Sequence, residues 1–204
     1  MTSGCGPAPG ARTDAGCFLL TQMACLSCGM SPQKPAWPRW QATPKRQRVA
    51  PAVPSPDGRT LLSSSSDNTL KLWDVTTLSC KATLIGHNGC VNGCAWRPDG
   101  TAIASASEDG TLKLWSAAAP FTCTATMNCD SGSLTACVWS PDGRYLVSCS
   151  YDANPGLWDV DAGSCVARLV GHAASVRTCA WSPDGLSLAT GDAMGTAKLW
   201  DVHY

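Results

Sequence analysis

The chain has 204 residues, and its 15 Lys and Arg residues balance 15 Asp and Glu residues, so the formal net charge is zero. Residues 1–48 carry six basic side chains and one acidic one, whereas residues 49–204 carry nine basic and fourteen acidic ones. The larger part is mildly acidic, which argues against a nucleic-acid-binding surface on it. No segment reaches the roughly 20 apolar residues of a membrane-spanning helix, so we expect neither nucleic acid nor a membrane as partner.

Residues 1–37 are rich in Gly, Ala, Pro, Ser and Cys and show no sustained hydrophobic period. This composition predicts a disordered or weakly ordered tail, followed by a domain over residues 38–204. Cys25 and Cys28 have the spacing of half a zinc site, but no second pair with suitable spacing follows. We therefore predict no metal site and no cofactor. The basic run at residues 44–48 is typical of a solvated linker, with a nuclear-localisation signal as the alternative.

A repeat organises the rest of the chain. Four Pro-Asp-Gly triplets recur at steps of 42, 43 and 42 residues, and a tryptophan follows each triplet at nearly constant distance. The four tryptophans are Trp73, Trp115, Trp158 and Trp200. A period of this length, kept by two unrelated markers, is that of one propeller blade. It divides the domain into repeats over roughly residues 38–75, 76–117, 118–160 and 161–202.

Each repeat contains short apolar segments between turn signals. In the second repeat these segments are residues 90–96, 102–107 and 111–115, separated by the Pro-Asp-Gly turn and by a second tight turn. A fourth segment follows the tryptophan, as at residues 80–85 and 165–170. We therefore predict an all-β fold in which four-stranded antiparallel sheets cover one another's faces as the blades of a β-propeller.

Thirteen cysteines would fit a secreted disulfide scaffold, but their positions favour free thiols. Cys94, Cys137 and Cys179 each lie two residues before a tryptophan, and alternate residues of a strand share a face. We expect these three to be small buried hydrophobic residues. Because many unpaired cysteines suit a reducing compartment, we expect an intracellular protein, in the cytoplasm, with the nucleus as the alternative.

The repeats resemble those of the WD-repeat family of β-propellers over roughly residues 38–202. The resemblance rests on the Gly-His pairs at residues 86–87 and 171–172, on the Pro-Asp-Gly turns and on an Asp six residues before Trp-Asp. It implies that each blade holds a buried polar tetrad, made of a His, a Ser or Thr, the Asp of the tight turn and the Trp. A closed network of this kind tolerates burial, whereas a half-satisfied one is costly.

The implied tetrad is complete in the second repeat alone, as His87, Ser105, Asp109 and Trp115. The other sets are Ser63, Asp67 and Trp73 in the first repeat, Ser148, Asp152 and Trp158 in the third, and His172, Thr190 and Trp200 in the fourth. Lys45 and Asp130 stand at the His position of the first and third repeats, and Met194 at the Asp position of the fourth. Pro54 and Pro155 fall within predicted strands, which predicts a loosely packed propeller, weakest at its N-terminal blade.

His87, Ser105 and Asp109 are also the residue types of a hydrolase triad. A catalytic serine needs an exposed hydroxyl and a nearby oxyanion hole, whereas these residues match structural positions of the family. We therefore predict no catalytic residue and no enzymatic activity.

The resemblance implies a non-enzymatic scaffold or adaptor that binds proteins or peptides through loops at one face. The resemblance also implies that the residue before the turn Asp points to that face, and these residues are Ser66, Glu108, Tyr151 and Ala193. Aromatic and Arg residues dominate binding energies, so Tyr151 is the first partner-binding candidate. Glu108 is a candidate charged contact, and Arg177 and Asn92, early in the first strands, are weaker candidates. The alternatives are the sensor or regulatory portion of a larger signalling protein and, less favoured, a propeller hydrolase.

Four blades are few, because members of the family usually have about seven. The last repeat supplies no fourth strand, and residues 39–43 align with the outer strands as the natural donor. Three interpretations remain open: an open or incomplete propeller that is a fragment of a longer one, a small closed ring, or self-association of two chains through their open blade edges. We favour the first.

Overall fold

The computed structural model describes residues 52–129 and 132–202, and the description below concerns these residues alone. The predicted tail, the basic run, the cysteine pair near residue 25, Lys45, Asp130 and the strand donor at residues 39–43 lie outside them. The strands are β1 (Val53–Pro54), β2 (Thr60–Ser64), β3 (Thr69–Asp74), β4 (Cys80–Ile85), β5 (Val91–Trp96), β6 (Ala102–Ser107), β7 (Thr111–Ser116), β8 (Cys123–Asn128), β9 (Leu134–Trp139), β10 (Tyr145–Ser150), β11 (Gly156–Asp159), β12 (Ser164–Arg168), β13 (Val176–Trp181), β14 (Ser187–Asp192) and β15 (Ala197–Asp201).

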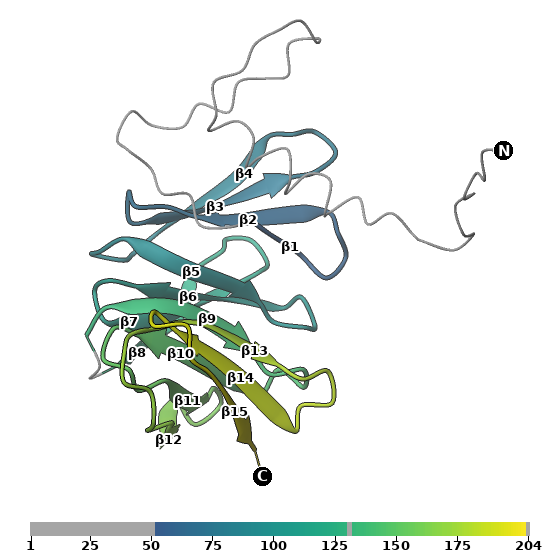
Figure 1. The fold of residues 1–204 in the computed structure, drawn as a ribbon. Coiled ribbons are helices and arrows are strands. Elements are labelled where there is room, and N and C mark those ends of the chain that lie inside the picture. Colours follow the sequence, from purple (N-terminus) through teal and green to yellow (C-terminus); the bar gives the residue numbers. More distant parts are fainter. Residues whose placement is uncertain (1–51, 130–131, 203–204) are drawn as a thin grey trace, which may run out of the picture. The chain divides into compact units, whose positions relative to one another are not determined.

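The strands form four antiparallel sheets, and no helix occurs in the described part of the chain (Figure 1). Within each sheet, neighbours in the sequence are neighbours in space. The first sheet is β1–β4, the second β5–β8, the third β9–β12 and the fourth, with three strands, β13–β15. The predicted all-β fold is confirmed, because these are sheets of the kind that propeller blades contain. Over the described residues, no helix is long and apolar enough to cross a membrane.

The Pro-Asp-Gly triplets form the turns between the first and second strands of each sheet. Their glycines have φ of 70° to 75°, a region that other residues rarely adopt. The aspartate caps the turn: Asp99 Oδ1 accepts the backbone N–H of Thr101 at 2.9 Å and its hydroxyl at 2.7 Å. The triplet therefore recurs because each element of it satisfies one requirement of the same turn.

Each sheet has two different faces, set by the alternation of side chains along its third strand. Leu72, Leu114, Leu157 and Leu199 occupy one position of this strand and define what we call the leucine face. The next residue in each strand is a tryptophan, which lies on the opposite, tryptophan face. Cross-strand neighbours extend these faces into rows, such as Ala95, Ala104 and Leu114 on the leucine face of the second sheet.

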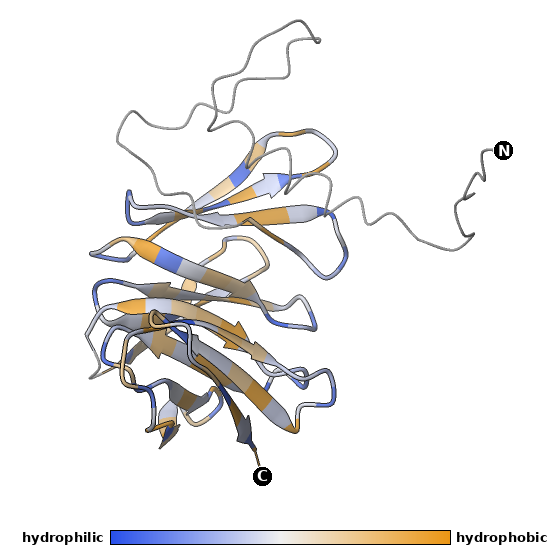
Figure 2. Ribbon diagram, in the orientation of Figure 1, coloured by the Kyte–Doolittle hydropathy of each residue, from blue (hydrophilic) through white to orange (hydrophobic). Residues whose placement is uncertain are grey.

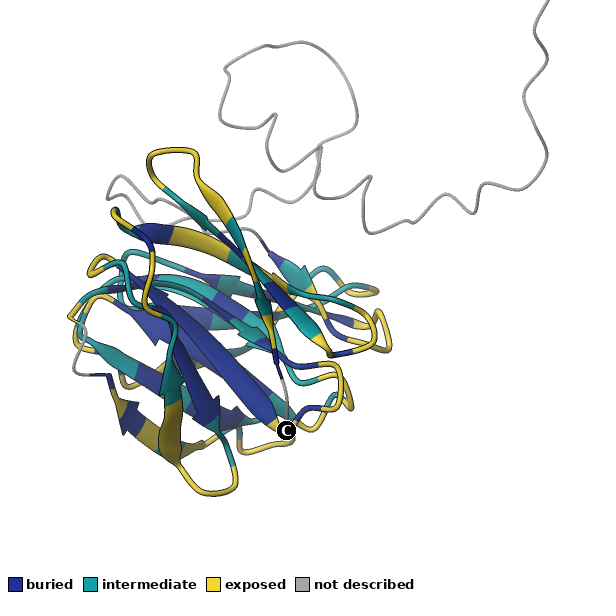
Figure 3. Ribbon diagram, turned by 60° about the horizontal axis from the view of Figure 1, so that its bottom comes forward, coloured by how far each residue is buried: buried dark blue, intermediate teal, exposed yellow. Residues whose placement is uncertain are grey.

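The core lies between the sheets, where a leucine face meets the tryptophan face of the next sheet. One apolar cluster joins Leu62 and Leu72 of the first sheet to Ile103 and Trp115 of the second. Equivalent clusters join the second sheet to the third and the third to the fourth. Hydrophobic residues follow the strands, and buried positions alternate with exposed turns (Figures 2 and 3). Because one sheet cannot bury both faces alone, the stack rather than the single repeat is the stable unit.

The two prolines lie at the end of a strand or next to one. In the third sheet β11 begins at Gly156, after Pro155, whereas the equivalent β3 and β7 begin at a threonine. In the first sheet β1 has two residues, and Pro54 pairs with Leu61. The low stability expected of the N-terminal sheet stays a prediction.

The three repeat cysteines are free. Cys94 and Cys137 are buried, and Cys179 is half-buried. Burial raises the pKa of the Cys94 thiol to about 12 and that of Cys137 well above its ordinary value. These side chains therefore remain protonated thiols that pack as apolar groups.

Candidate functional site

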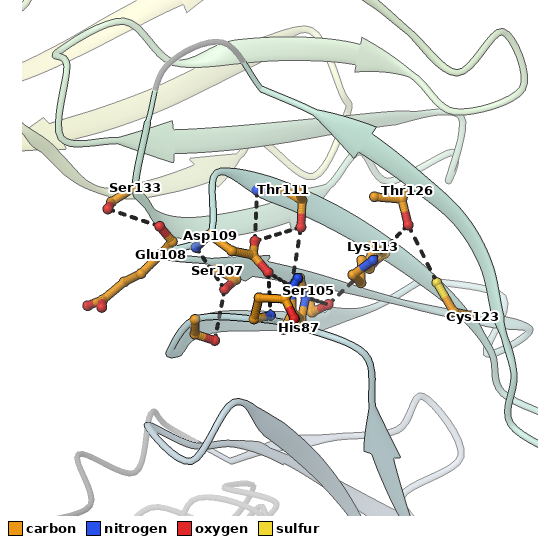
Figure 4. A network of polar contacts seen from close by, with 12 residues as sticks. His87, Ser105, Ser107, Glu108, Asp109, Thr111, Lys113, Cys123, Thr126 and Ser133 are labelled. Carbon is orange, nitrogen blue, oxygen red and sulfur yellow. Dashed lines mark hydrogen bonds and ion pairs between the residues drawn. The ribbon is translucent and has the colours of Figure 1, made fainter.

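The second sheet holds a complete polar network (Figure 4). His87 enters from the loop before β5, and its Nδ1 lies 2.9 Å from Asp109 Oδ2 in the tight turn after β6. On the other side of the ring, Nε2 lies 2.7 Å from the hydroxyl of Ser105. That hydroxyl in turn accepts the indole N–H of Trp115 at 2.9 Å. The structure thus brings the four predicted residues of this repeat together.

The direction of each hydrogen bond follows from the carboxylate. Asp109 only accepts, so Nδ1 of His87 donates, and Nε2 of a neutral ring is left to accept the proton of Ser105. Burial lowers the pKa of His87, which is consistent with a neutral imidazole. Burial would raise the pKa of Asp109, but hydrogen bonds from Thr111, from the backbone of Asn88 and from His87 hold it well below its ordinary range.

This network is closed to substrates. Ser105 is 0% exposed, and Trp115, which covers it, is 2% exposed. A serine nucleophile must reach a substrate carbonyl, and here the hydroxyl is held between an imidazole and an indole in the core. The arrangement stabilises the contact between loop and sheet.

The fourth sheet reaches the same arrangement with a different aspartate. His172 Nδ1 lies 2.8 Å from Asp192 Oδ2, and its Nε2 lies 2.7 Å from Thr190, which accepts the Trp200 indole N–H at 2.8 Å. Met194, at the aligned position, is 78% exposed. Asp192 lies two residues before the position that the repeat pattern assigns to the aspartate, so the sequence prediction did not include it in the tetrad. The sequence feature that could have pointed to Asp192 is a carboxylate in a repeat that also contains the Gly-His pair and the Trp.

In the first and third sheets, the described residues include the Trp–Ser part of the network. Trp73 donates to Ser63 and Trp158 donates to Ser148, both at 2.9 Å. The turn aspartates of these sheets also make local hydrogen bonds, as Asp67 accepts the hydroxyl of Thr69 at 2.6 Å. Asp152 similarly caps its own turn, where it accepts the backbone N–H of Asn154 at 3.0 Å.

The predicted partner-binding residues gather at one end of the sheets. We call this end the loop face; second strands end there and first strands begin. Arg177, at the start of β13, lies over the ring of Tyr151, with its guanidinium carbon 4.6 Å from the ring centroid. One of its nitrogens also donates to the Tyr151 hydroxyl at 3.2 Å. Both side chains are exposed, and they come from different sheets.

Asn92 and Glu108 form a second pair on the loop face. The amide of Asn92 donates to the carbonyl of Leu134 at 2.9 Å and reaches the exposed carboxylate of Glu108 at 3.5 Å. The backbone carbonyl of Glu108 accepts the hydroxyl of Ser133, while its carboxylate points away from the buried network (Figure 4). These contacts tie the second sheet to the third.

A pocket of about 250 Å³ opens between the first strands β5, β9 and β13. Asn92, Thr135 and Arg177, each the second residue of its strand, contribute polar atoms to its lining. Thr135 donates to the carbonyl of Val176 at 2.6 Å and was not a sequence candidate. Ser66 and Ala193, the other residues before the turn Asp positions, are not among the pocket residues.

Within the described ranges, no group of three or more His, Cys, Asp or Glu side chains is placed to hold a metal ion. The polar residues of the loop face are donors and acceptors of hydrogen bonds, and they include the exposed side chains of Arg177 and Glu108.

Comparison with known proteins identifies the repeat. The family model described as "WD domain, G-beta repeat" matches residues 49–74, 78–116, 121–159 and 163–201, which is more than half of the chain. A 39-residue stretch is 49% identical to a Lissencephaly-1 homolog from Branchiostoma floridae. That similarity covers 19% of this chain and 10% of the relative. With its sheets, turns and Trp–Ser/Thr contacts, the chain belongs to the WD-repeat family.

Proposed function

We propose that the protein is a non-enzymatic interaction scaffold that binds acidic protein segments at its loop face. WD-repeat proteins are generally protein-interaction scaffolds, and the choice of partner chemistry rests on Arg177. This side chain is exposed and is not part of any ion pair among the described residues. Its contact with Tyr151 occupies one of its five donors, so the guanidinium can still receive a carboxylate with two hydrogen bonds.

Tyr151 supports this role by ordering the cation. Stacking on an aromatic ring holds a guanidinium that would otherwise lose rotamer freedom on binding. The neighbouring pocket adds the carbonyl of the Asn92 amide and the hydroxyl of Thr135 as polar groups for a peptide backbone. We infer that an acidic side chain contacts Arg177 while the adjoining peptide lies over the pocket.

Alanine substitution tests this proposal. The chain offers a matched control, because Arg144 lies over Tyr145 at 5.1 Å at the opposite end of its sheet, beside a Pro-Asp-Gly turn. An array of short immobilised peptides, in which each acidic peptide has an Asn or Gln twin, measures binding directly. We expect the double substitution Tyr151→Ala and Arg177→Ala to lower the affinity for the acidic peptides about tenfold or more. Arg144→Ala should leave that affinity unchanged.

The proposal is contradicted if the double variant binds the acidic peptides as tightly as the unchanged protein does. It is also contradicted if the unchanged protein binds the acidic peptides and their Asn or Gln versions equally well. Circular dichroism on the variants separates lost binding from lost fold. The regulatory portion of a larger signalling protein remains the alternative function, and turnover in a broad hydrolase screen would overturn the non-enzymatic assignment.

Self-association through open blade edges is a second proposal. The outer side of β15 pairs with no strand among the described residues, whereas β3, β7 and β11 each pair with a fourth strand. An unpaired edge offers backbone donors and acceptors to another chain. Sedimentation velocity measures the resulting mass.

We also propose an intracellular location, in the cytoplasm. Nine cysteines of the described residues are free, three of them exposed, and such thiols persist in a reducing compartment. Imaging of a tagged chain tests this, and secretion or confinement to the nucleus would contradict it.

A further inference from the structure

The leucine face of the fourth sheet is exposed, although the same face of every other sheet is core. Leu72, Leu114 and Leu157 are 0%, 6% and 8% exposed, whereas the equivalent Leu199 is 79% exposed. These four leucines belong to one chain and occupy the same position of the repeat, so their exposed fractions can be compared directly. It shows that this face is built for burial and is uncovered in the single chain over the described residues.

The row around Leu199 has the composition of a buried row. Ala180 pairs with Ala189, and Ala189 pairs with Leu199. The second sheet has the same residues, Ala95, Ala104 and Leu114, in the same register. Small side chains beside one leucine leave room for the large side chains of a tryptophan face.

The second and third sheets display the matching surface. The row of Ala104 and Leu114 packs in one cluster with Trp139, Leu146 and Trp158. Trp139 also donates its indole N–H to the carbonyl of Ala95 at 3.3 Å. The natural occupant of the leucine face is therefore a row of large apolar side chains on another sheet.

The first sheet carries the corresponding face at the other end of the series. Its row is Pro54, Leu61 and Trp73. Leu61 is half-buried, whereas the equivalent Ile103, Leu146 and Leu188 are 0%, 0% and 1% exposed. Among the described residues, the two middle sheets pack on other sheets through both faces, whereas each end sheet packs on another sheet through one face.

We infer that a second copy of this chain covers these faces head to tail. The leucine face of the fourth sheet of one copy packs on the tryptophan face of the first sheet of the other, and the same contact in return closes the pair. The contact joins two different surfaces, so it closes into a ring or extends into a filament. Two copies contribute eight sheets, within the range of four to eight blades found in propellers.

This inference rests on the self-association proposed above and moves its contact from the edge of β15 to the sheet faces. It is independent of peptide binding, because the loop face lies at the strand ends. The two proposals therefore fail separately.

Sedimentation velocity on the full 204-residue chain over a range of concentrations tests the inference. We expect twice the monomer mass of 21.2 kDa. Leu199→Lys should weaken the pair about tenfold or more, because it places a charge in the contact. The site is exposed, so the variant is expected to fold. Val166→Lys is the matched control: Val166 is 57% exposed, lies on the outer strand of the third sheet, and should leave the mass unchanged.

A mixing experiment checks the head-to-tail arrangement. Leu199→Lys retains the tryptophan face and Leu61→Lys retains the leucine face, so an equal mixture should form a pair although each variant alone is monomeric. A monomeric unchanged chain overturns self-association altogether. A Leu199→Lys variant that still pairs overturns the face contact alone, and an open-ended polymer overturns the closed pair.

Discussion

At the scale of single residues, His87 links the fold to pH. Its imidazole is buried and neutral, donates to Asp109 and accepts from Ser105. Burial lowers its pKa below the ordinary value of 6.5, so the folded chain binds this proton less readily than the unfolded chain. The stability that follows from this difference is fully present above about pH 6.5 and is lost as pH falls through the lowered pKa of the folded state.

Substitution of His87 tests this account. We expect the free energy of unfolding of the unchanged chain to decrease as pH falls below about 6.5. His87→Gln should cost about 1–3 kcal/mol at neutral pH, because Asp109 and Ser105 lose their partner. The free energy of unfolding of the variant should also vary less with pH, down to about pH 4. Below that pH the stabilising contribution of Asp109, whose pKa is lowered, begins to be lost. Urea titrations at several pH values measure both effects. An equal dependence of the free energy of unfolding on pH in the two proteins would contradict this role of His87.

At the scale of elements, Gly93 sets the distance between the second and third sheets. A Cβ atom at this position of β5 would lie 2.8 Å from the Cα of Ala136 in β9 and 3.1 Å from the backbone nitrogen of Cys137. Backbone atoms cannot rotate away, so a methyl group must separate the strands that line the loop-face pocket. Glycine is required here by the close approach of two strands, with no unusual φ.

Gly93→Ala is therefore expected to lower the free energy of unfolding by about 1–3 kcal/mol, as overpacking does elsewhere. Gly191→Ala is the matched control. The Cβ of that variant would meet the end of the Thr178 side chain at 3.0 Å, on the exposed leucine face, where the side chain can move. A denaturant titration should rank the two variants in this order, and a tolerant Gly93 would show that the sheets are not in close contact.

The elements could be predicted from the sequence because their signals are local. The Pro-Asp-Gly turns, the alternation of apolar residues and the Trp–Ser spacing all lie within one repeat. Asp192 could not be assigned, because its carboxylate reaches His172 through the shape of a turn. The contacts of Arg177 with Tyr151 and of Asn92 with Leu134 join different sheets, and such pairs depend on how sheets pack.

At the scale of the molecule, the two ends of the strands differ in chemistry. The Pro-Asp-Gly end repeats the same capped turn in each sheet, so its residues are engaged with their own backbone. The loop face varies between sheets and carries Glu108, Tyr151 and Arg177 at its rim. A scaffold needs a rigid support and variable contacts, and the chain places these at opposite ends of the same strands.

The most direct test of this account is a charge exchange at Arg177. Peptides that bind the unchanged protein are titrated against Arg177→Glu, each in its acidic form and in a form with Lys at the acidic position. The account predicts that the affinity of the variant for the acidic peptides falls about tenfold or more, and that its affinity for the Lys forms rises. Undiminished binding of the acidic peptides to Arg177→Glu would contradict it.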